Sequence, residues 1–488
     1  MGKRSRAIAA VATVVALITA SCSEPEPDTA ATADSEPAVT EPAEPESGDT
    51  EPADTEPETG DTEPAEPEPT DTEPDTTDTG TDTGNDTDTD VPDDGSVVWQ
   101  LGGAEWFLGT LPTSATPADD SLEPVRIGMI NQENTPLGSF PEVRAAAEAA
   151  VAWVNAELGG VGGRPVELVT CVTSFDVEQS QSCALQMVQD DVIALVGGVD
   201  VTSNGSYPVI EQNGLAVVGG IPANLVEQRS ANAFFFSGGG TGAAAAYMSH
   251  AADNGAQRVA LAYGEFESFE VAARDYGAVV GESLGLEVEL VPFSIVATDF
   301  LPVLTKAQEI DADALIVLAA DSACLPVMET AVDLGYDGQL YLTGACAADA
   351  IIEAAGEAAV GPLFNSEGPV QTGDPEAEVF ELVTDTYATE PAGGAGTVGF
   401  RGFMNLYALM VELGPDAVSS ESLIELARSA VDRPSFWGHP YTCDGAQVPG
   451  LPALCAPQQV LFEVPAVGEE VAGATDWIDT PALFSVIE

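Results

Sequence analysis

Positively charged residues are scarce in this chain of 488 residues, which has 13 Lys and Arg against 81 Asp and Glu and a formal net charge of −68. Of the acidic residues, 27 lie between Glu24 and Asp94. The other 54 face 10 basic residues from Ser96 onward, so this later part alone carries about −44. Such a charge repels nucleic acids and anionic lipid headgroups, and we therefore exclude DNA and RNA as partners.

Histidines and motifs that commonly supply catalytic groups or metal ligands are also few. The chain has two histidines and contains no G-x-S-x-G, H-E-x-x-H, S-x-x-K or C-x-x-C motif. Each of these motifs places a nucleophile, a base or metal ligands at a fixed spacing. His250 falls in an alanine-rich helical stretch and His439 in a turn, where structural roles are more common. The sequence therefore predicts no catalytic residue, no metal site, no cofactor and no enzyme.

Hydrophobic runs of membrane-spanning length are missing. The longest early run, Ala7–Ile18, follows Lys3, Arg4 and Arg6 and is too short to cross a hydrocarbon core of about 30 Å as a helix. Its position is typical of a secretory signal. Small residues then precede Cys22, which resembles a bacterial lipobox, although an ordinary signal peptide with a chance cysteine has the same pattern. We predict a lipoprotein signal peptide over residues 1–22 and a lipid anchor on Cys22 at the outer face of the cytoplasmic membrane.

Cysteine usage agrees with export. Seven cysteines leave an odd one, and setting Cys22 aside leaves six, enough for three disulfides. An oxidising compartment permits them. Sequential pairing is the simplest of the 15 connectivities. It would join Cys171 with Cys183, Cys324 with Cys346, and Cys443 with Cys455.

Large apolar residues are nearly absent from residues 23–95, which consist of Glu-Pro, Asp-Thr and Thr-Glu-Pro units. Such a segment buries too little surface to offset its chain entropy, so we predict a disordered linker that tethers a domain to the membrane. Residues 96–124 differ, because they contain Trp99, Trp106, Phe107 and Leu108. We expect this bridging segment to pack onto the folded body.

From Val125 onward, short apolar stretches alternate with alanine-rich helical stretches, which predicts an α/β fold with parallel sheets covered by helices. Nine strands over some 240 residues exceed the need of one mononucleotide-binding half, so two lobes fit better. The predicted strands are Val125–Ile130, Pro165–Cys171, Ile193–Val196, Ala216–Gly219, Phe234–Phe236, Val259–Tyr263, Glu287–Phe293, Ala314–Leu318 and Gln339–Leu342. The clearest helical stretches are Glu142–Leu158, Ser180–Asp190, Phe269–Leu284 and Ala323–Leu334.

Four segments of this body carry a family resemblance. They are Ile127-Gly128 entering Pro136-Leu137-Gly138, the stretch Val154–Pro165 with its paired glycines, Ala194–Gly198, and Asp299–Leu304 followed by Asp311–Leu315. In order and spacing they resemble the type I solute-binding proteins of ABC transporters, in the branched-chain amino-acid-binding family. The likeness covers Val125–Glu463. It implies two Rossmann-like lobes hinged by three crossovers, which close around a solute, and ABC permease subunits as partners.

The resemblance also implies domain limits. The solute-binding domain would span residues 125–465, with lobe 1 at about 125–236 and 366–430 and lobe 2 at about 237–365 plus a C-terminal part. Residues 466–488 would form a C-terminal tail. The protein would be an extracytoplasmic, lipid-anchored binding protein.

Solutes in such folds contact loops at the carboxyl ends of strands. In lobe 1 these loops contain Gly138, Ser139 and Phe140, then Thr202 and Ser203, then Gly220, Pro222 and Ala223. In the family, a hydroxyl residue of the second loop binds a ligand carboxylate, and Thr202 or Ser203 matches it. Capping of the next helix is the common alternative for such residues. The third loop has Ala223 where the family often has Ser or Thr.

Lobe 2 would contribute Tyr263, Glu265 and Phe269 from one loop, and Thr343 and Gly344 from another. Amino-acid binders of the family hold the ligand ammonium with an acid after a late strand. Ala345 occupies that place here, and Asp321, Asp349 and Glu265 are the candidates to replace the missing acid. We expect a small carboxylate-bearing solute: a branched-chain or other amino acid, or an amide, with aromatic acids also open.

Two alternatives come from other classes. The loop Gly238–Ala243 contains G-x-G-x-x-A after a strand, with Glu265 located 22 positions later, which is close to the dinucleotide fingerprint of NAD(P)-binding oxidoreductases. Glycines at a lobe crossover explain the same pattern. The other alternative is a ligand-sensing ectodomain for a membrane partner, which the sequence does not separate from transport.

Overall fold

The computed structural model describes residues 95–135, 138–370 and 373–487. The predicted signal peptide, the Cys22 anchor and the linker up to residue 94 lie outside these residues. The described residues belong to one compact unit. Within these ranges, no helix is both long and apolar enough to cross a membrane.

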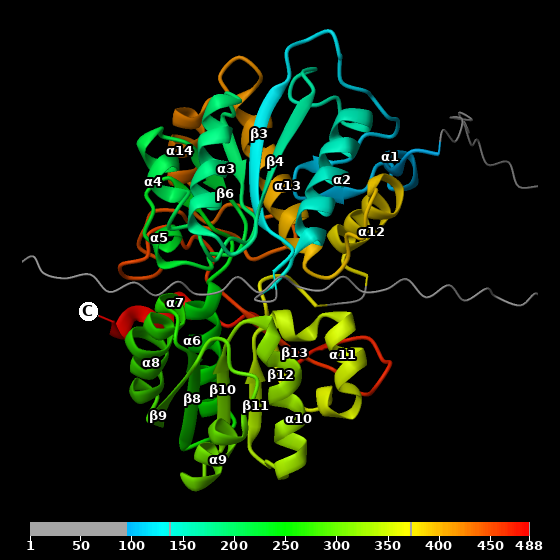
Figure 1. Ribbon diagram of the computed structural model, residues 1–488. Helices are drawn as coiled ribbons and strands as arrows, with labels where there is room; N and C mark the ends of the chain where they lie inside the picture. Colours follow the sequence, from blue (N-terminus) through cyan, green and yellow to red (C-terminus); the bar gives the residue numbers. More distant parts are fainter. Residues whose placement is uncertain (1–94, 136–137, 371–372, 488) are drawn as a thin grey trace, which may run out of the picture. The chain divides into compact units, whose positions relative to one another are not determined.

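The first lobe is built on a five-stranded sheet in which every pairing is parallel (Figure 1). Side chains alternate between its two faces, as the period of a strand requires: Ile127 and Met129 face one core, and Ile130 faces the other. In sheet order the strands are β4 (Val166–Thr173), β3 (Val125–Gln132), β5 (Ala194–Val196), β6 (Ala216–Val218) and β7 (Ala233–Phe234). The helices are α2 (Pro141–Glu157), α3 (Val177–Gln189), α4 (Tyr207–Gln212), α5 (Leu225–Gln228), α12 (Pro375–Tyr387), α13 (Gly396–Leu413) and α14 (Ser420–Arg428).

The second lobe is built on a seven-stranded sheet. Its strands, in sheet order, are β14 (Ala472–Gly473), β13 (Val460–Glu463), β12 (Leu363–Ser366), β11 (Gln339–Leu342), β10 (Ala314–Leu318), β8 (Arg258–Gly264) and β9 (Glu287–Phe293). The longer helices are α6 (Gly239–Asp253), α8 (Ala278–Ser283), α9 (Leu301–Glu309), α10 (Cys324–Leu334) and α11 (Asp349–Ala355). Shorter turns are α7 (Glu267–Val271), η1 (Ala272–Gly277), η2 (Asp321–Ala323), η3 (Gly344–Ala347), η4 (Gly356–Ala359), α15 (Thr480–Leu483) and η5 (Phe484–Val486).

Both sheets confirm the predicted α/β class with two Rossmann-like lobes. All nine predicted strands are present, and Glu287–Phe293, Ala314–Leu318 and Gln339–Leu342 keep their predicted bounds. Strands β12, β13 and β14 were not predicted, and β13 pairs antiparallel with both of the others. Residues 466–487, expected as a tail, supply β14 and bury Phe484 in the core of lobe 2.

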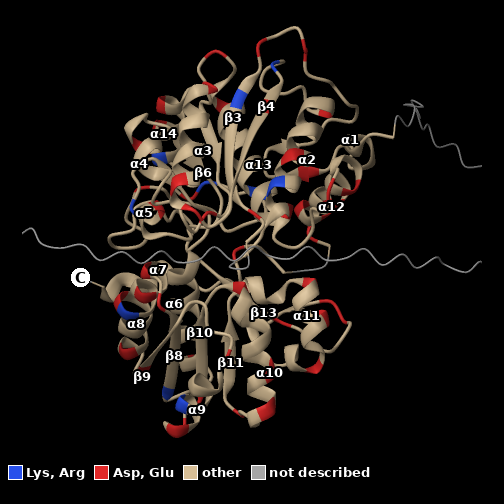
Figure 2. Ribbon diagram, in the orientation of Figure 1, with Lys and Arg blue, Asp and Glu red and all other residues tan. Residues whose placement is uncertain are grey.

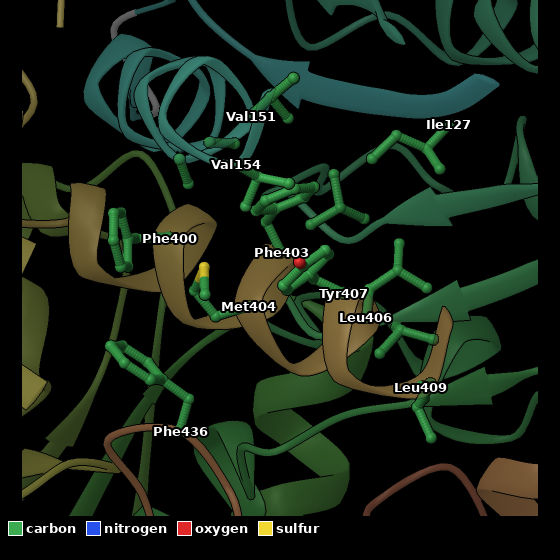
Figure 3. Close-up of a cluster of buried hydrophobic side chains, with 14 of the residues drawn as sticks. Ile127, Val151, Val154, Phe400, Phe403, Met404, Leu406, Tyr407, Leu409 and Phe436 are labelled. Atoms are coloured by element: carbon green, nitrogen blue, oxygen red, sulfur yellow. The ribbon is translucent and has the colours of Figure 1, made fainter. Parts of the chain in front are cut away.

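Helix α13 is the core element of lobe 1. Its sequence is apolar on nearly every side, as in a helix that is buried all round. Figure 3 shows Phe400, Phe403 and Met404 of this helix packed beneath α2. Glycines permit the close approach, because a Cβ on Gly399 would lie 1.9 Å from the Val143 carbonyl oxygen. This packing joins α2 and α13 into one helix layer on a face of the lobe 1 sheet.

The chain passes between the lobes three times, as the family resemblance implied. It leaves lobe 1 after β7, returns after β12, and re-enters lobe 2 before β13. We call these segments the first (residues 235–238), second (367–370 and 373–374) and third (456–459) crossovers.

The bridging segment 96–124 packs onto lobe 1. It contains helix α1 (Val97–Gln100) and a hairpin of β1 (Glu105–Trp106) and β2 (Gly109–Thr110). The buried carboxylate of Glu157 accepts hydrogen bonds from the backbone N–H groups of Val97 (2.9 Å) and Val98 (2.7 Å). The Trp106 ring contacts Trp153 edge to face, with ring centroids 5.6 Å apart. The segment is therefore part of the lobe.

Candidate functional site

Loops at the carboxyl ends of the strands meet between the two lobes. The Ser268 hydroxyl of lobe 2 donates a hydrogen bond of 2.8 Å to the Ala223 carbonyl of lobe 1. A Cβ on Gly138 would lie 3.4 Å from Asp321 Oδ1, which belongs to the loop after β10. We call this region, defined by Gly138, Ala223, Ser268 and Asp321, the interlobe junction.

The first loop runs from β3 into α2 and contains three predicted site residues. Gly138 adopts a φ of 118°, and its carbonyl accepts a hydrogen bond of 2.9 Å from the buried Gln132 side chain. The exposed Ser139 hydroxyl accepts from the Asn134 N–H at 3.0 Å. Phe140 is the N-cap residue of helix α2, and its carbonyl accepts a hydrogen bond from the Asn131 side chain at 2.7 Å. The loop is thus fixed by amide side chains at the end of β3.

The second loop holds Thr202 and Ser203, and both are buried. The Thr202 hydroxyl donates to Asp200 Oδ1 at 2.7 Å, and the Thr202 N–H donates to the same oxygen at 3.0 Å. The N-cap of helix α4 is Ser206. Neither Thr202 nor Ser203 caps this helix, so the capping alternative is wrong. The Ser203 hydroxyl is buried beside the Glu227 carboxyl, and the Thr202 hydroxyl also contacts the Asp176 carbonyl at 3.4 Å.

A buried acid pair lies beneath the second loop. Asp200 and Glu227 line a cavity of about 30 Å³ together with Tyr207. Burial raises the pKa of Glu227 well above its ordinary value, and the nearby charge of Asp200 raises it further. Sequence reasoning missed Glu227. The signal was present, because Asn224 and Glu227 have the spacing of a capping box, which the structure contains.

The third loop contains Gly220, Pro222 and Ala223. A Cβ on Gly220 would lie 2.6 Å from the Gly197 carbonyl carbon, and its φ is 86°, so this position requires glycine. The Pro222 carbonyl accepts from the Gln228 side chain at 3.0 Å. The third loop therefore packs tightly against the end of β5 and reaches Ser268 of lobe 2 through Ala223.

Tyr263 and Glu265 share a pocket of about 280 Å³ at the ends of β8 and β9. Its other lining residues are Phe266, Glu267, Glu270, Arg274 and Pro292. The Arg274 guanidinium lies 5.4 Å from the centroid of the buried Tyr263 ring and donates a hydrogen bond to its hydroxyl. Phe269 does not line this pocket. Its ring lies beside Gly240 at the start of α6.

Thr343 and Gly344 follow β11. The Gly344 N–H donates to Asn365 Oδ1 at 2.8 Å, and the Thr343 carbonyl accepts from the Cys346 N–H at 2.9 Å. The disulfide between Cys324 and Cys346 joins this loop to the start of α10. The loops after β10 and β11 are thereby linked covalently.

Two half-buried carboxyl groups lie near the interlobe junction, close enough for the charge of Asp321 to raise the pKa of Glu142. Asp321 follows β10 in lobe 2, and Glu142 lies in the first turn of α2 in lobe 1. Burial raises the pKa of Asp321. Burial is also the main cause of the raised pKa of Glu142, and the charges of Glu133 and Asp321 raise it further. Of the three acids considered for the ligand amine, Asp321 approaches the Gly138 loop, whereas Asp349 is exposed at the start of α11.

Glu142 was missed because an acid in the first turn of a helix has an ordinary structural explanation. The Glu133 carboxylate, in contrast, forms an ion pair with Arg144, with 2.9 Å between Glu133 Oε1 and Arg144 Nε. Within the described ranges, no group of three or more His, Cys, Asp or Glu is arranged to hold a metal ion.

The glycines of the loop 238–243 serve backbone packing. A Cβ on Gly238 would lie 2.8 Å from the Pro457 carbonyl oxygen, and one on Gly242 would lie 2.7 Å from the same atom. Gly238 ends the first crossover and Gly242 lies in the first turn of α6, and both pack against the third crossover. This contact explains the glycine pattern that suggested a dinucleotide site.

The three predicted disulfides are confirmed with sequential pairing. They join Cys171 to Cys183, Cys324 to Cys346, and Cys443 to Cys455.

Comparisons with known proteins agree with this architecture. Solved structures similar to this chain include a leucine-binding protein from Thermotoga maritima, at 22% identity over 72% of this chain and 98% of that one, with a TM-score of 0.60. A fatty acid ABC transporter substrate-binding protein from Thermomonospora curvata has 15% identity over 76% and 97%, with a TM-score of 0.63. A solute-binding protein from Rhodopseudomonas palustris, in complex with 3,4-dihydroxybenzoic acid, has 17% identity over 73% and 98%, with a TM-score of 0.61.

At these identities the likeness shows the fold. Sequence comparison with functionally curated proteins gives no match. The model of the periplasmic binding protein family matches residues 124–429, which is more than half of the chain. The chain therefore belongs to the periplasmic binding protein family, of type I, whose members are extracytoplasmic solute-binding proteins of ABC transporters.

Proposed function

We propose that this protein captures a small carboxylate-bearing solute, a branched-chain or other amino acid or an amide, between its lobes and presents it to an ABC permease. The observation that carries the proposal is the interlobe junction, where loops from the ends of β3 and β6 meet loops from lobe 2. Family members are binding proteins for transport, so the protein binds without catalysing a reaction.

The first lobe supplies the carboxylate contacts in this proposal. Backbone N–H groups of the loops around Gly138, Ser203 and Ala223 lie at strand ends, where they favour an anion. Because the Thr202 hydroxyl is bonded to Asp200, it acts by holding its loop in place. Gly220 and Pro222 shape the third loop. The solute's side chain would lie toward Phe140 and Phe269, with Ser139 at the open edge.

The second lobe supplies the counter-charge for an amine. Asp321 and Glu142 lie on opposite lobes, and each is costly to ionise when half-buried and without an ion-pair partner. An ammonium group between them removes that cost. Tyr263, Glu265, Thr343 and Gly344 complete this wall. The solute contacts both lobes only when they close, so its binding stabilises the closed form.

Export and anchoring belong to the same proposal. Lipidation of Cys22 would hold the protein at the outer face of the cytoplasmic membrane, with residues 23–95 as a tether. Metabolic labelling with a fatty acid tests this directly. Label that persists in a Cys22→Ala variant would contradict the lipid anchor.

A thermal-shift screen of amino acids, amides and aromatic carboxylates, followed by calorimetry, tests the binding function. We expect at least one amino acid or amide to raise the melting temperature. Thr202→Ala combined with Ser203→Ala should then weaken its affinity by about tenfold, an energy near 1.4 kcal/mol, while the fold is retained. A protein that no member of the panel stabilises would contradict the proposed solute class.

The role of Asp321 has its own test. Asp321→Asn should weaken binding of the amino acid identified in the screen by roughly tenfold or more, since it removes a charge at the amine. Binding of the same solute without its amino group should not weaken. Asp349→Asn, an exposed acid of the same lobe, is the matched control and should bind like the natural protein.

A further inference from the structure

The side chain of Asn365 lies where four parts of the molecule converge. Asn365 is the third residue of β12 and is buried. Its Oδ1 accepts hydrogen bonds from the Gly344 N–H (2.8 Å) and from the Tyr247 hydroxyl (2.9 Å). Its Nδ2 donates to Gln459 Oε1 at 2.7 Å. One amide therefore joins the loop after β11, helix α6, strand β12 and the third crossover.

The partners of Asn365 are themselves fixed. The fully buried Gln459 donates from Nε2 to the Pro457 carbonyl at 3.3 Å, within the third crossover. The Tyr247 hydroxyl also lies within hydrogen-bonding distance of the Leu342 carbonyl at the end of β11, so its single proton is shared between that oxygen and Asn365 Oδ1. In a buried network whose members are all bonded, a shift of one group strains the others.

The second crossover begins two residues later and reaches the other lobe. Glu367 Oε1 accepts from the Ser237 hydroxyl of the first crossover at 2.9 Å. Its backbone carbonyl accepts from Arg401 Nη1 of α13, in lobe 1, at 2.7 Å. The short stretch 365–367 thus contacts all three crossovers and the helix layer of lobe 1.

We propose that Asn365 is a positioning residue that sets the orientation of the two lobes and couples it to the loop 343–347. An amide group is planar, so its Oδ1 and Nδ2 move together. A displacement of the Gly344 N–H is therefore transmitted to Gln459 and the third crossover. That the loop 343–347 contacts the solute rests on the proposed function, whereas the link from this loop to the lobes does not.

The test measures the distance between the lobes in the full-length protein without any added solute. Spin labels on Glu178 of α3 and Glu329 of α10, both exposed, report the distance distribution by pulsed electron resonance. Labels are attached through an azide-bearing amino acid, because cysteine labelling would disturb the three disulfides. Asn365→Ala should make the distribution roughly twofold broader or displace its maximum, since the crossovers lose their shared contact.

Asn155→Ala is the matched control for lost amide hydrogen bonds. Asn155 bonds the backbone of Val166 through both polar atoms, at 2.8 Å each, within lobe 1. Both variants should lower the melting temperature, but the control should leave the interlobe distance unchanged. If Asn365→Ala lowers the melting temperature and leaves the distribution as in the natural protein, its role is merely structural and the proposal is wrong. If Asn365→Ala fails to fold, Gln459→Met is used in its place, because it removes the acceptor of the hydrogen bond from Asn365 Nδ2.

Gly344→Ala tests the coupling from the loop. A Cβ at this position would lie 2.2 Å from the Asn365 carbonyl oxygen, so one of the two must move. The interlobe distance should shift as in Asn365→Ala. Gly393→Ala, where the added atom meets nothing within 4 Å, should not shift it. An unchanged distance in Gly344→Ala would sink the coupling. Failure of every solute in the screen would instead remove the proposed function and leave these distance results standing.

Discussion

Three buried or half-buried carboxyl groups in this chain meet the cost of burial in different ways. Glu157 receives hydrogen bonds from two backbone N–H groups, from the Trp153 indole and from the Tyr387 hydroxyl. Glu227 receives the Asn224 N–H at 2.7 Å and shares its surroundings with another acid. Asp321 is half-buried, and its charge raises the pKa of Glu142. Full hydrogen bonding suits a structural carboxylate, whereas an incompletely paired one invites a proton or a ligand.

Glu227 should make stability depend on pH. Its folded-state pKa is raised by burial, so the folded protein holds this proton to higher pH than the unfolded chain. Stability is therefore lost as pH rises from the unfolded-state pKa through the folded-state pKa. Glu227→Gln cannot ionise. Its melting temperature should match that of the natural protein below about pH 4 and exceed it increasingly as pH rises.

Thermal melts of both proteins from acidic to neutral pH check this expectation. Glu211→Gln, an exposed acid of the neighbouring helix α4, serves as the control and should follow the natural protein throughout. A constant difference between Glu227→Gln and the natural protein at every pH would contradict the assigned pKa direction.

At the scale of elements, α1 has a sequence too short to be stable alone, and Glu157 supplies the acceptors for its first N–H groups. Glu157→Gln should destabilise the folded protein by about 2–3 kcal/mol. The variant loses hydrogen bonds to a carboxylate, and its side-chain amide N–H would lie against one of the backbone N–H donors of α1. Chemical denaturation gives the energy, and proteolysis shows whether residues 95–111 are released.

Glu148→Gln is the control for this change, since Glu148 lies on the same helix and is partly exposed beside Arg144. It should cost little. Equal losses in the two variants would show that Glu157 has no special part in holding α1.

The elements show what the sequence could predict. Buried parallel strands such as Ala314–Leu318 are continuous apolar runs, so their bounds were readable. The predicted helix 269–284 begins at Glu267 and contains a π-helical turn, Ala272–Gly277, because the backbone there follows packing against α6. Strand β14 has two residues and no signal of its own, since it exists only through pairing with β13.

The candidate site was predictable only in part, for a related reason. Loops at strand ends follow from the alternation of strands and helices, so Gly138, Ala223 and Thr343 could be named. Contacts between loops of different lobes depend on how the lobes meet, which no local pattern records. The approach of Asp321 to Gly138 is of this kind.

At the scale of the whole molecule, charge is the dominant feature. Figure 2 shows Asp and Glu spread over both lobes with few Lys or Arg among them. Net repulsion of this size opposes the compact state. Raising NaCl from about 0.05 M to about 1 M should therefore raise the melting temperature, because the Debye length falls from about 13 Å to about 3 Å.

Choline chloride at matched ionic strength separates screening from specific binding of sodium. If screening is the cause, both salts should stabilise the protein alike. A melting temperature that falls or stays constant across the salt series would contradict net repulsion as a destabilising term.

The docking of α1 on Glu157 has a mechanical consequence. A force applied to the chain before residue 95 would act on lobe 1 through α1. It would be transmitted to α2 and to the helix layer that α2 forms with α13. This load path meets the second crossover at the hydrogen bond from Arg401 of α13 to the Glu367 carbonyl. Tension applied ahead of residue 95 would therefore load lobe 1 first, so lobe 1 is the fixed part and lobe 2 the moving part when the angle between the lobes changes.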